Sequence, residues 1–327
     1  MLSGTFNKQQ LPCNAINAHS LLLTAPRHLQ WITETLPTLQ YDEVLVQTTT
    51  GAISIGAELA QFRGTYRGSH AAHFPRMTGY ESVGIILACG EAVQNLHVGQ
   101  RIVSFYGHRT YAIIPATKAI PVPDNISDTL AILAILTCDA SKGIYKVAPQ
   151  PDEAVLITGA GAIGLLTLVM LKARGIQQVD VVEPNEHRRE LATLLGARRA
   201  MDSTEAQLSE PHYPIGIECS SYNTAFTLLQ NKVRQNGRLC ILADGNIEPL
   251  VLTPDFHEKE LIVIASSDGL DYQQHARWFF SHVLPEQSQL LEKLFEYEIT
   301  AHQLIDTFER LASGTISPIK VLVHYEQ

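Results

Sequence analysis

The chain has 327 residues, of which 45% are hydrophobic and 17% are charged, a balance typical of a folded globular protein. Its length predicts about two domains, because a domain usually has about 100–200 residues. Lysine and arginine number 24 against 33 aspartates and glutamates, so the formal net charge is −9, which argues against nucleic acid as a partner because a phosphate backbone attracts a positive surface.

The cysteines and the N-terminal residues predict a cytoplasmic protein. The five cysteines form no C-x-x-C pair, and their odd number indicates no disulfide framework, so we expect a reducing compartment. The first 20 residues lack the apolar segment of a secretory signal. Residues 154–171 are uncharged and approach the length of a membrane span, but the three glycines among them have another explanation, given below, and we expect no contact with a membrane.

From residue 21 to about residue 147, the sequence predicts short strands separated by turns. Apolar runs occur at residues 44–46, 82–87, 101–105 and 111–114, and glycines lie between them at the spacing of turns. This pattern is typical of a β-rich domain.

From about residue 154, the pattern changes to strands that alternate with helices. Buried strands are predicted at residues 154–157, 179–182, 215–217, 238–242 and 261–264. Such alternation indicates βαβ units and a parallel sheet. In the tail, an amphipathic helix is predicted with Leu304, Ile305, Phe308 and Leu311 on one face, followed by a last strand at residues 320–324.

A glycine motif between the first of these strands and the following helix predicts a dinucleotide site. Residues 159–164 read G-A-G-A-I-G, which is the G-x-G-x-x-G pattern in its required position after a strand and before a helix. Glycines allow a tight turn and a close approach of the backbone to a pyrophosphate, which the helix N-terminus then holds. The candidate cofactor contacts in this turn are Gly159, Gly161, Ala162, Ile163 and Gly164. Packing glycines in a plain βαβ unit are the alternative.

The acidic residue Glu183 favours NAD over NADP. It lies 19 positions after Gly164, at the end of the next predicted strand, where a carboxylate accepts hydrogen bonds from the adenosine ribose and repels a 2′-phosphate. Arg188, Arg189 and Arg199 lie nearby and could weaken this discrimination, so NADP stays possible. A solvated loop carboxylate is the alternative for Glu183.

Taken together, these motifs resemble the medium-chain dehydrogenase/reductase superfamily, the relatives of zinc-type alcohol dehydrogenases. The resemblance covers nearly the whole chain and rests on the segments D-E-V-L-V (42–46), G-Y-E-S-V-G (79–84), H-V-G-Q-R-I (97–102), the glycine motif and residues 308–323. It implies an α/β protein. A β-rich GroES-like catalytic domain would comprise residues 1–147 and 290–327, and a Rossmann domain with a doubly wound parallel sheet would bind the nucleotide with residues 148–289.

The resemblance also implies further cofactor contacts and an assembly. Arg188 stands five positions after Glu183, where the family often has a basic residue, and Leu242 and Ala243 stand at the end of a predicted strand. Family members are usually dimers or tetramers that associate through the nucleotide-binding domain. We therefore expect a homodimer or homotetramer.

The sequence departs from the family at the positions of the catalytic zinc ligands. Ser54 stands where the first cysteine is usual and Tyr80 where the histidine is usual, while Glu81 is retained and Cys138 falls at the third position. Hydroxyl and phenol groups are poor neutral ligands for zinc, so we expect no metal. The chain is most similar to the zinc-lacking, bacteriochlorophyllide dehydrogenase-like members, which oxidise a hydroxyethyl side chain to acetyl.

Three residues are candidates for the chemistry in place of zinc. Tyr80 is the first, as a hydrogen-bond donor or a general acid/base, although a phenol with a reference pKa of ~10 needs help to act as a base near pH 7. Ser54 could hold the substrate oxygen, and Glu81 could orient Tyr80 or a cofactor contact. A packed aromatic ring, a space-filling serine and a structural carboxylate are the respective alternatives.

The resulting functional prediction is a zinc-independent, NAD(P)-dependent oxidoreductase that interconverts a secondary alcohol and a ketone on a small organic molecule. One alternative is reduction of an activated C=C bond in an enone or quinone, which zinc-free relatives perform. Another is a dinucleotide-binding sensor or scaffold that has lost catalysis, since the lost ligands would be expected there too.

Overall fold

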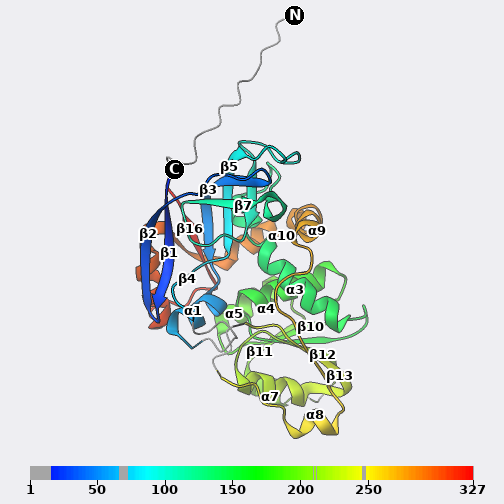
Figure 1. Cartoon of the computed structure of the whole chain (residues 1–327). Helices are drawn as coiled ribbons and strands as arrows, with labels where there is room; N and C mark the ends of the chain where they lie inside the picture. Colours follow the sequence, from blue (N-terminus) through cyan, green and yellow to red (C-terminus); the bar gives the residue numbers. More distant parts are fainter. Residues whose placement is uncertain (1–15, 66–72, 209, 211, 245–247, 327) are drawn as a thin grey trace, which may run out of the picture.

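Sheets of two kinds occupy opposite ends of the molecule, one group largely antiparallel and the other parallel (Figure 1). This computed structural model describes residues 16–65, 73–208, 210, 212–244 and 248–326. The two kinds of sheet correspond to the predicted GroES-like and Rossmann folds, so the α/β fold class is confirmed. Among the described residues, none of the helices combines the length and apolarity that crossing a membrane requires.

Within the described residues the parallel sheet has six strands in the order β11-β10-β9-β12-β13-β14. Their bounds are Val155–Thr158 (β9), Val179–Val182 (β10), Arg199–Met201 (β11), Tyr213–Glu218 (β12), Val233–Ile241 (β13) and Ile262–Ala265 (β14). The chain runs outward from β9 through β10 to β11 and then returns to the other side of β9 at β12. Strands β9, β10 and β12 are buried along their whole length because helices cover both faces.

The helices of this region follow from the alternating pattern. Helix α4 (Ala162–Ala173) comes directly after the glycine motif, and α5 (Glu186–Leu194) begins at Asn185, whose side chain caps the helix. Figure 1 shows α3 (Ala134–Val147) and α4 on one side of the parallel strands and α7 (Asn223–Lys232) on the other. The uncharged stretch at residues 154–171 is therefore a strand, a turn and a buried helix.

The other large sheet joins the N-terminal half of the chain to its C-terminal strands. Its order is β15-β16-β3-β5-β6-β8, and β7 also pairs with β3. Its strands are Glu43–Ile53 (β3), Glu81–Cys89 (β5), Arg101–Ser104 (β6), Tyr111–Pro115 (β7), Ile120–Pro121 (β8), Phe295–Thr300 (β15) and Lys320–His324 (β16). Strand β16 pairs with β3, so the end of the chain completes a sheet that the first half begins.

A smaller antiparallel sheet and two helices cover this sheet. The sheet has the order β2-β1-β4, with bounds His28–Thr35 (β2), Asn17–Ala25 (β1) and Arg76–Met77 (β4). Helix α1 (Ile55–Arg63) packs on α11 (Leu304–Ala312), with the Phe62 and Phe308 rings 5.4 Å apart. In α11, Leu304, Phe308 and Leu311 are buried as predicted. Ile305 was predicted on the same face but is 37% exposed, because it lies about 100° around the helix from Leu304.

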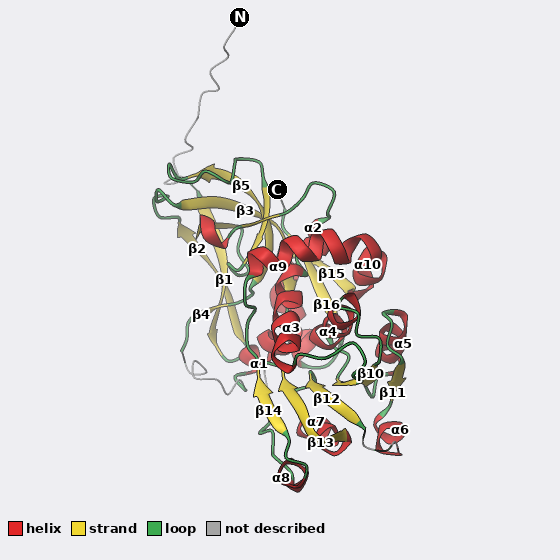
Figure 2. Ribbon diagram, turned by 90° about the vertical axis from the view of Figure 1, so that its right-hand side faces the viewer, coloured by secondary structure: helices red, strands yellow, loops and turns green. Residues whose placement is uncertain are grey.

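A layer of helices lies between the two sheet systems (Figure 2). After β14 the chain forms α9 (Tyr272–Trp278), a π-helical turn at Phe279–Val283 and α10 (Leu284–Leu291). In the described part of the chain, the other α-helices are α2 (Asp128–Ala131), α6 (Ser203–Leu208) and α8 (Pro254–Glu258).

Candidate active site

The glycine turn lies where the strand order of the parallel sheet reverses. Gly159 has φ = +92°, a conformation that strongly favours glycine, and a Cβ at Gly164 would overlap the carbonyl oxygen of Gly159. Gly161 is different, because a Cβ built there meets nothing within 4 Å. Gly161 also precedes the first residue of α4, so this open space lies at a helix N-terminus, which suits a pyrophosphate.

Glu183 reaches back to this turn from the end of β10. Its carboxylate accepts hydrogen bonds from the backbone N–H of Ala160 (2.7 Å) and of Asn185 (3.0 Å), and the residue is 6% exposed. The guanidinium of Arg188 points elsewhere and donates to Ser317 at 3.2 Å. The structure therefore brings Glu183 to the glycine turn and directs Arg188 toward the C-terminal segment.

Three buried polar atoms at the carboxyl edge of the parallel sheet have no hydrogen-bond partner within the described part of the chain. They are Thr158 Oγ1 at the end of β9, Glu218 Oε2 at the end of β12 and Ser266 Oγ just after β14. Buried polar atoms normally have partners, and this edge is where open α/β sheets bind ligands. The residues present therefore fit a dinucleotide. Sequence reasoning missed all three, although a polar residue that ends a buried apolar run was the available signal.

Leu242 and Ala243 lie beside these atoms, directly after β13. Both of their backbone N–H groups donate to the carbonyl oxygen of Glu218, at 3.0 and 3.1 Å. Burial raises the pKa of the Glu218 carboxyl, and hydrogen bonds from Ser220 and Ser221 only partly oppose this. Backbone hydrogen bonds thus hold the ends of β12 and β13 together next to the glycine turn.

Next to the antiparallel sheet, Tyr80 and Ser54 form a direct hydrogen bond. Ser54 stands at the N-cap of α1 and Tyr80 immediately before β5, and Tyr80 Oη donates to Ser54 Oγ at 2.5 Å. The burial of the phenol and the nearby charge of Glu81 raise the pKa of Tyr80 well above its usual value. Tyr80 is therefore a neutral hydroxyl at physiological pH and is suited to donate a hydrogen bond rather than to act as a base.

Glu81 is held by the last strand of the chain. Both of its carboxylate oxygens accept from Lys320 Nζ, at 2.8 and 2.9 Å, and both side chains are completely buried. Burial raises the pKa of Glu81, an effect that the Lys320 charge opposes. This ion pair between β5 and β16 fits the alternative of a structural carboxylate, and a role of Glu81 in orienting Tyr80 or a cofactor contact stays a prediction.

The structure adds two acidic residues to which the sequence analysis gave no role. Glu58 accepts from the backbone N–H of Ser54 at 2.8 Å and of Gly79 at 2.9 Å. Asp139, on α3, accepts from Tyr272 Oη at 2.6 Å, and burial raises its pKa to about 7. For Glu58 the available signal was the segment I-S-I-G-A-E at residues 53–58, which it ends. The contact of Asp139 joins residues 133 positions apart and has no local signal.

The donor groups at the positions of the zinc ligands are all hydroxyls or thiols. Burial raises the pKa of the Cys138 thiol to about 11, so it is protonated near pH 7. Within the described ranges, no group of three or more histidine, cysteine, aspartate and glutamate side chains is arranged to hold a metal ion.

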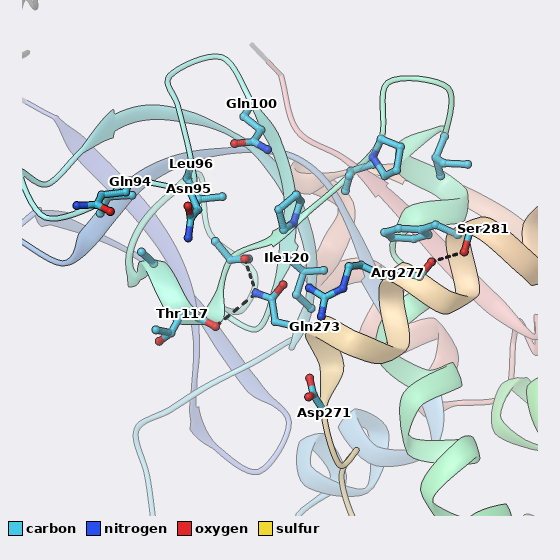
Figure 3. A pocket seen from close by; sticks show the side chains of 18 of the residues that line it. Gln94, Asn95, Leu96, Gln100, Thr117, Ile120, Asp271, Gln273, Arg277 and Ser281 are labelled. Carbon is cyan, nitrogen blue, oxygen red and sulfur yellow. Dashed lines mark hydrogen bonds between the residues drawn. The ribbon is translucent and has the colours of Figure 1, made fainter.

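A large cavity of about 1310 Å³ lies elsewhere, between the antiparallel sheet and the helices that follow β14 (Figure 3). The lining includes Ile120, Asp271, Arg277 and Gln273, whose side-chain amide donates to the carbonyl oxygen of Ala119 at 2.7 Å. Among the described residues that line it, none is a candidate catalytic or cofactor residue. The large volume of this cavity is therefore no reason to place the active site in it.

Comparisons with known proteins agree with this architecture. Two family models match: the alcohol dehydrogenase GroES-like domain over residues 40–124 and the zinc-binding dehydrogenase over residues 162–281. A related protein is the L-threonine 3-dehydrogenase of Serratia proteamaculans, 24% identical over 87% of this chain and 93% of that protein.

Solved structures share the fold over nearly the whole chain. Galactitol-1-phosphate dehydrogenase from Escherichia coli has a TM-score of 0.80 and 19% identity, with coverage of 94% of this chain and 99% of that chain. A short chain alcohol dehydrogenase from Escherichia coli, complexed with NADH, has a TM-score of 0.75 and 22% identity, with the same coverage.

A parallel sheet whose order reverses at a glycine turn, joined to a GroES-like domain, defines a nicotinamide-dependent oxidoreductase. The chain belongs to the medium-chain dehydrogenase/reductase superfamily.

Proposed function

We propose that this chain is a zinc-independent oxidoreductase of the zinc-lacking branch, which interconverts a secondary alcohol and a ketone by hydride transfer with NAD(H). The observation that carries the proposal is the hydrogen bond between Tyr80 and Ser54. These two hydroxyls stand at two of the three positions where the superfamily resemblance places zinc ligands. The substrate would be a small or mid-sized organic molecule.

The chemistry of the donor set supports zinc independence. Zinc in proteins prefers thiolate, imidazole and carboxylate ligands. At neutral pH the phenol of Tyr80 and the thiol of Cys138 both keep their protons because burial raises the pKa of each. The hydroxyl of Ser54 is a poor ligand as well. These three groups do not fit a zinc ion, so the proposed reaction has no step through a metal.

The hydroxyl pair can polarise the substrate oxygen in place of a metal ion. Tyr80 and Ser54 together carry two hydroxyl protons, and their mutual hydrogen bond uses one of them. The other O–H is available to a substrate oxygen, whichever hydroxyl carries it. Nicotinamide, when bound, supplies or accepts the hydride. During reduction, the free O–H would hydrogen-bond the carbonyl oxygen and pass its proton to the alkoxide that forms when the hydride reaches the carbonyl carbon, and water would return a proton to the hydroxyl. During oxidation, the proton of the alcohol would leave through the same hydroxyl to water.

The surroundings of Glu183 support NAD over NADP. Its carboxylate would repel a 2′-phosphate at the glycine turn. The nearby arginines have other partners: Arg189 donates to the carbonyl oxygens of Glu183 and Pro184, and Arg199 pairs with Asp180 at 2.7 Å. A phosphate on the ribose would therefore meet the Glu183 carboxylate, and the charge of Arg199 is already balanced by Asp180. Arg188 and Arg189 donate to uncharged oxygens and keep their positive charge, so the NADPH titration below decides how far they weaken the preference.

A fluorescence titration of the metal-stripped protein with NADH and then NADPH tests the cofactor proposal. We expect micromolar binding of NADH and weaker binding of NADPH, followed by turnover of secondary alcohols or ketones in the presence of a chelator. Tighter binding of NADPH would contradict the role of Glu183. Turnover confined to enones would favour C=C reduction, and binding of neither cofactor would favour a protein without this activity.

The Tyr80→Phe variant tests the hydroxyl pair directly. Removal of the phenol oxygen takes away one of the two hydroxyls that polarise the substrate, so turnover should fall ~10²-fold or more, in the range typical of a lost acid/base group. Binding of NADH should be unchanged, because Tyr80 lies outside the parallel sheet. Steady-state kinetics and the same titration measure both effects. Unchanged turnover would contradict the assignment of Tyr80.

A further inference from the structure

One buried carboxylate connects the backbones of both residues in the hydroxyl pair. Glu58 lies in the first turn of α1 and its side chain is 3% exposed. Its Oε1 accepts from the Ser54 N–H at 2.8 Å, and its Oε2 accepts from the Gly79 N–H at 2.9 Å. Gly79 directly precedes Tyr80, so a single side chain fixes the backbone at, or next to, each of the two hydroxyl residues.

The hydroxyl of Ser54 is left free for Tyr80, because it makes no capping contact with its own helix. A serine at an N-cap usually turns its hydroxyl toward a backbone N–H in the first turn of its own helix. Ser54 makes no such side-chain cap. Instead, Glu58 holds the serine backbone, and Ser54 Oγ accepts the hydrogen bond from Tyr80 at 2.5 Å.

His108 supports the second carboxylate oxygen of Glu58. Its ring is completely buried, and Nε2 lies 3.1 Å from Glu58 Oε2. The ring also lies directly against Gly79, because a Cβ on that glycine would come within 2.8 Å of it. On its other side, Nδ1 is 3.5 Å from Tyr325 Oη. Three donors therefore converge on one carboxylate, an arrangement whose charge-assisted hydrogen bonds are stronger than neutral ones.

We propose that Glu58 is a positioning residue that holds Tyr80 and Ser54 in the geometry of their hydrogen bond, with His108 as its support. Glu58 would not itself contact the substrate. This inference rests on the proposed function for its catalytic consequence, but the geometry it concerns can be measured without turnover. Small displacements of reacting groups are costly, since about 1 Å can reduce a rate ~10²-fold.

The Glu58→Gln variant removes the carboxylate of Glu58 with little change in the size of the side chain. A glutamine side chain offers one carbonyl oxygen, so it cannot accept from both the Ser54 and the Gly79 N–H groups, and its amide would face one of them as a second donor. We expect turnover to fall about tenfold or more, with the NADH dissociation constant unchanged within about twofold. Asp128→Asn is the matched control. Asp128, on α2, is also a carboxylate that accepts several hydrogen bonds, from Thr49 on β3 at 2.7 Å and from Arg101 on β6 at 2.8 Å.

A double-mutant cycle separates positioning from general destabilisation. If Glu58 acts through Tyr80, then Glu58→Gln combined with Tyr80→Phe should turn over about as fast as Tyr80→Phe alone. Asp128→Asn should instead leave turnover nearly unchanged with and without Tyr80→Phe. Losses that multiply in the Glu58 double variant would overturn the proposal. If Glu58→Gln does not fold, Glu58→Asp, which keeps the charge but is shorter by one methylene, takes its place in the same cycle.

A second readout does not depend on catalysis. Tyrosine labelled with ¹³C at Cζ gives one NMR signal for each tyrosine, and Tyr80→Phe identifies the signal of Tyr80 by its loss. We expect Glu58→Gln to shift this signal and Asp128→Asn to leave it in place. An unmoved Tyr80 signal in Glu58→Gln would overturn the inference. If the wild-type protein turns over no alcohol or ketone while the signal still shifts, the proposed function fails and the positioning role stands.

Discussion

At the scale of single residues, burial decides which groups near the hydroxyl pair carry charge. Tyr80 stays neutral because desolvation and Glu81 raise the pKa of its phenol. Asp139 is more finely balanced, because burial raises its pKa from 3.8 to about 7, against the hydrogen bond that it accepts from Tyr272. A carboxyl group of this kind changes its protonation within the physiological range.

The raised pKa of Asp139 predicts a pH-dependent difference in stability between the wild type and Asp139→Asn. In the folded state the carboxyl keeps its proton up to about pH 7, whereas the ordinary pKa of this group, which applies in the unfolded chain, is 3.8. The group therefore favours folding below pH ~4, and this contribution is lost as the pH rises to about 7. Asparagine cannot ionise but can still accept from Tyr272.

The asparagine variant should accordingly gain stability relative to the wild type as the pH rises from about 4 to about 7, with no further gain above that. We expect a gain of about 1–3 kcal/mol, since one pKa unit corresponds to ~1.4 kcal/mol and partial exposure to solvent reduces the effect. Denaturant unfolding at several pH values measures it. A difference that does not change with pH would show that Asp139 has an ordinary pKa.

At the scale of secondary-structure elements, the turn between β9 and α4 separates packing from binding. Gly164 is needed for packing, because a side chain there would overlap the carbonyl oxygen of Gly159 and push α4 from the sheet. Gly161 has room for a side chain and precedes the first residue of the helix. Gly164 is therefore required by the packing of α4 on the sheet, whereas Gly161 leaves room for a ligand.

Alanine at these two positions should give different results. Gly164→Ala should lower both stability, by about 1–3 kcal/mol through overpacking, and the affinity for NADH. Gly161→Ala should keep the stability of the wild type but weaken NADH binding about tenfold or more, because its methyl group would occupy the approach of the pyrophosphate. Thermal unfolding and NADH titration of both variants measure this contrast. Full affinity in Gly161→Ala would exclude the turn as the pyrophosphate site.

At the scale of the whole molecule, an ion pair joins parts of the chain that are 239 residues apart. Lys320 on β16 reaches Glu81 on β5 with both side chains completely buried. A buried charge without its partner is costly, whereas a complete pair is close to neutral relative to apolar residues. The region around Tyr80 is therefore stable only when β16 is in place, because β16 carries the lysine that balances the charge of Glu81.

Removal of one partner should be much more harmful than removal of both. Lys320→Met should lower the free energy of unfolding by about 3–5 kcal/mol because it leaves the Glu81 carboxyl buried and unpaired. Lys320→Met combined with Glu81→Leu should recover a large part of this loss. Denaturant unfolding of the single and double variants measures the difference. Equal losses in both would mean that the pair contributes through packing alone.

The sequence by itself determined the features that depend on neighbouring residues. The predicted strands at residues 154–157 and 179–182 and the turn at 159–164 lie where expected, because apolar runs and glycine turns are local patterns. The superfamily followed from the same motifs. The absence of zinc, the catalytic role of Tyr80 and the cofactor preference set by Glu183 stay predictions from residue type.

Only the tertiary structure decided how the candidate residues are connected. Tyr80 and Ser54 are 26 residues apart, and Glu58 meets His108 across 50 residues. The sequence left open whether Glu81 orients Tyr80, serves a cofactor contact or is structural, and only the fold shows that its partner is a lysine on the last described strand. Residue types and short motifs indicate which chemistry is available, whereas hydrogen-bond partners and pKa values depend on burial and on contacts between distant segments. These exist only once the sheets have formed.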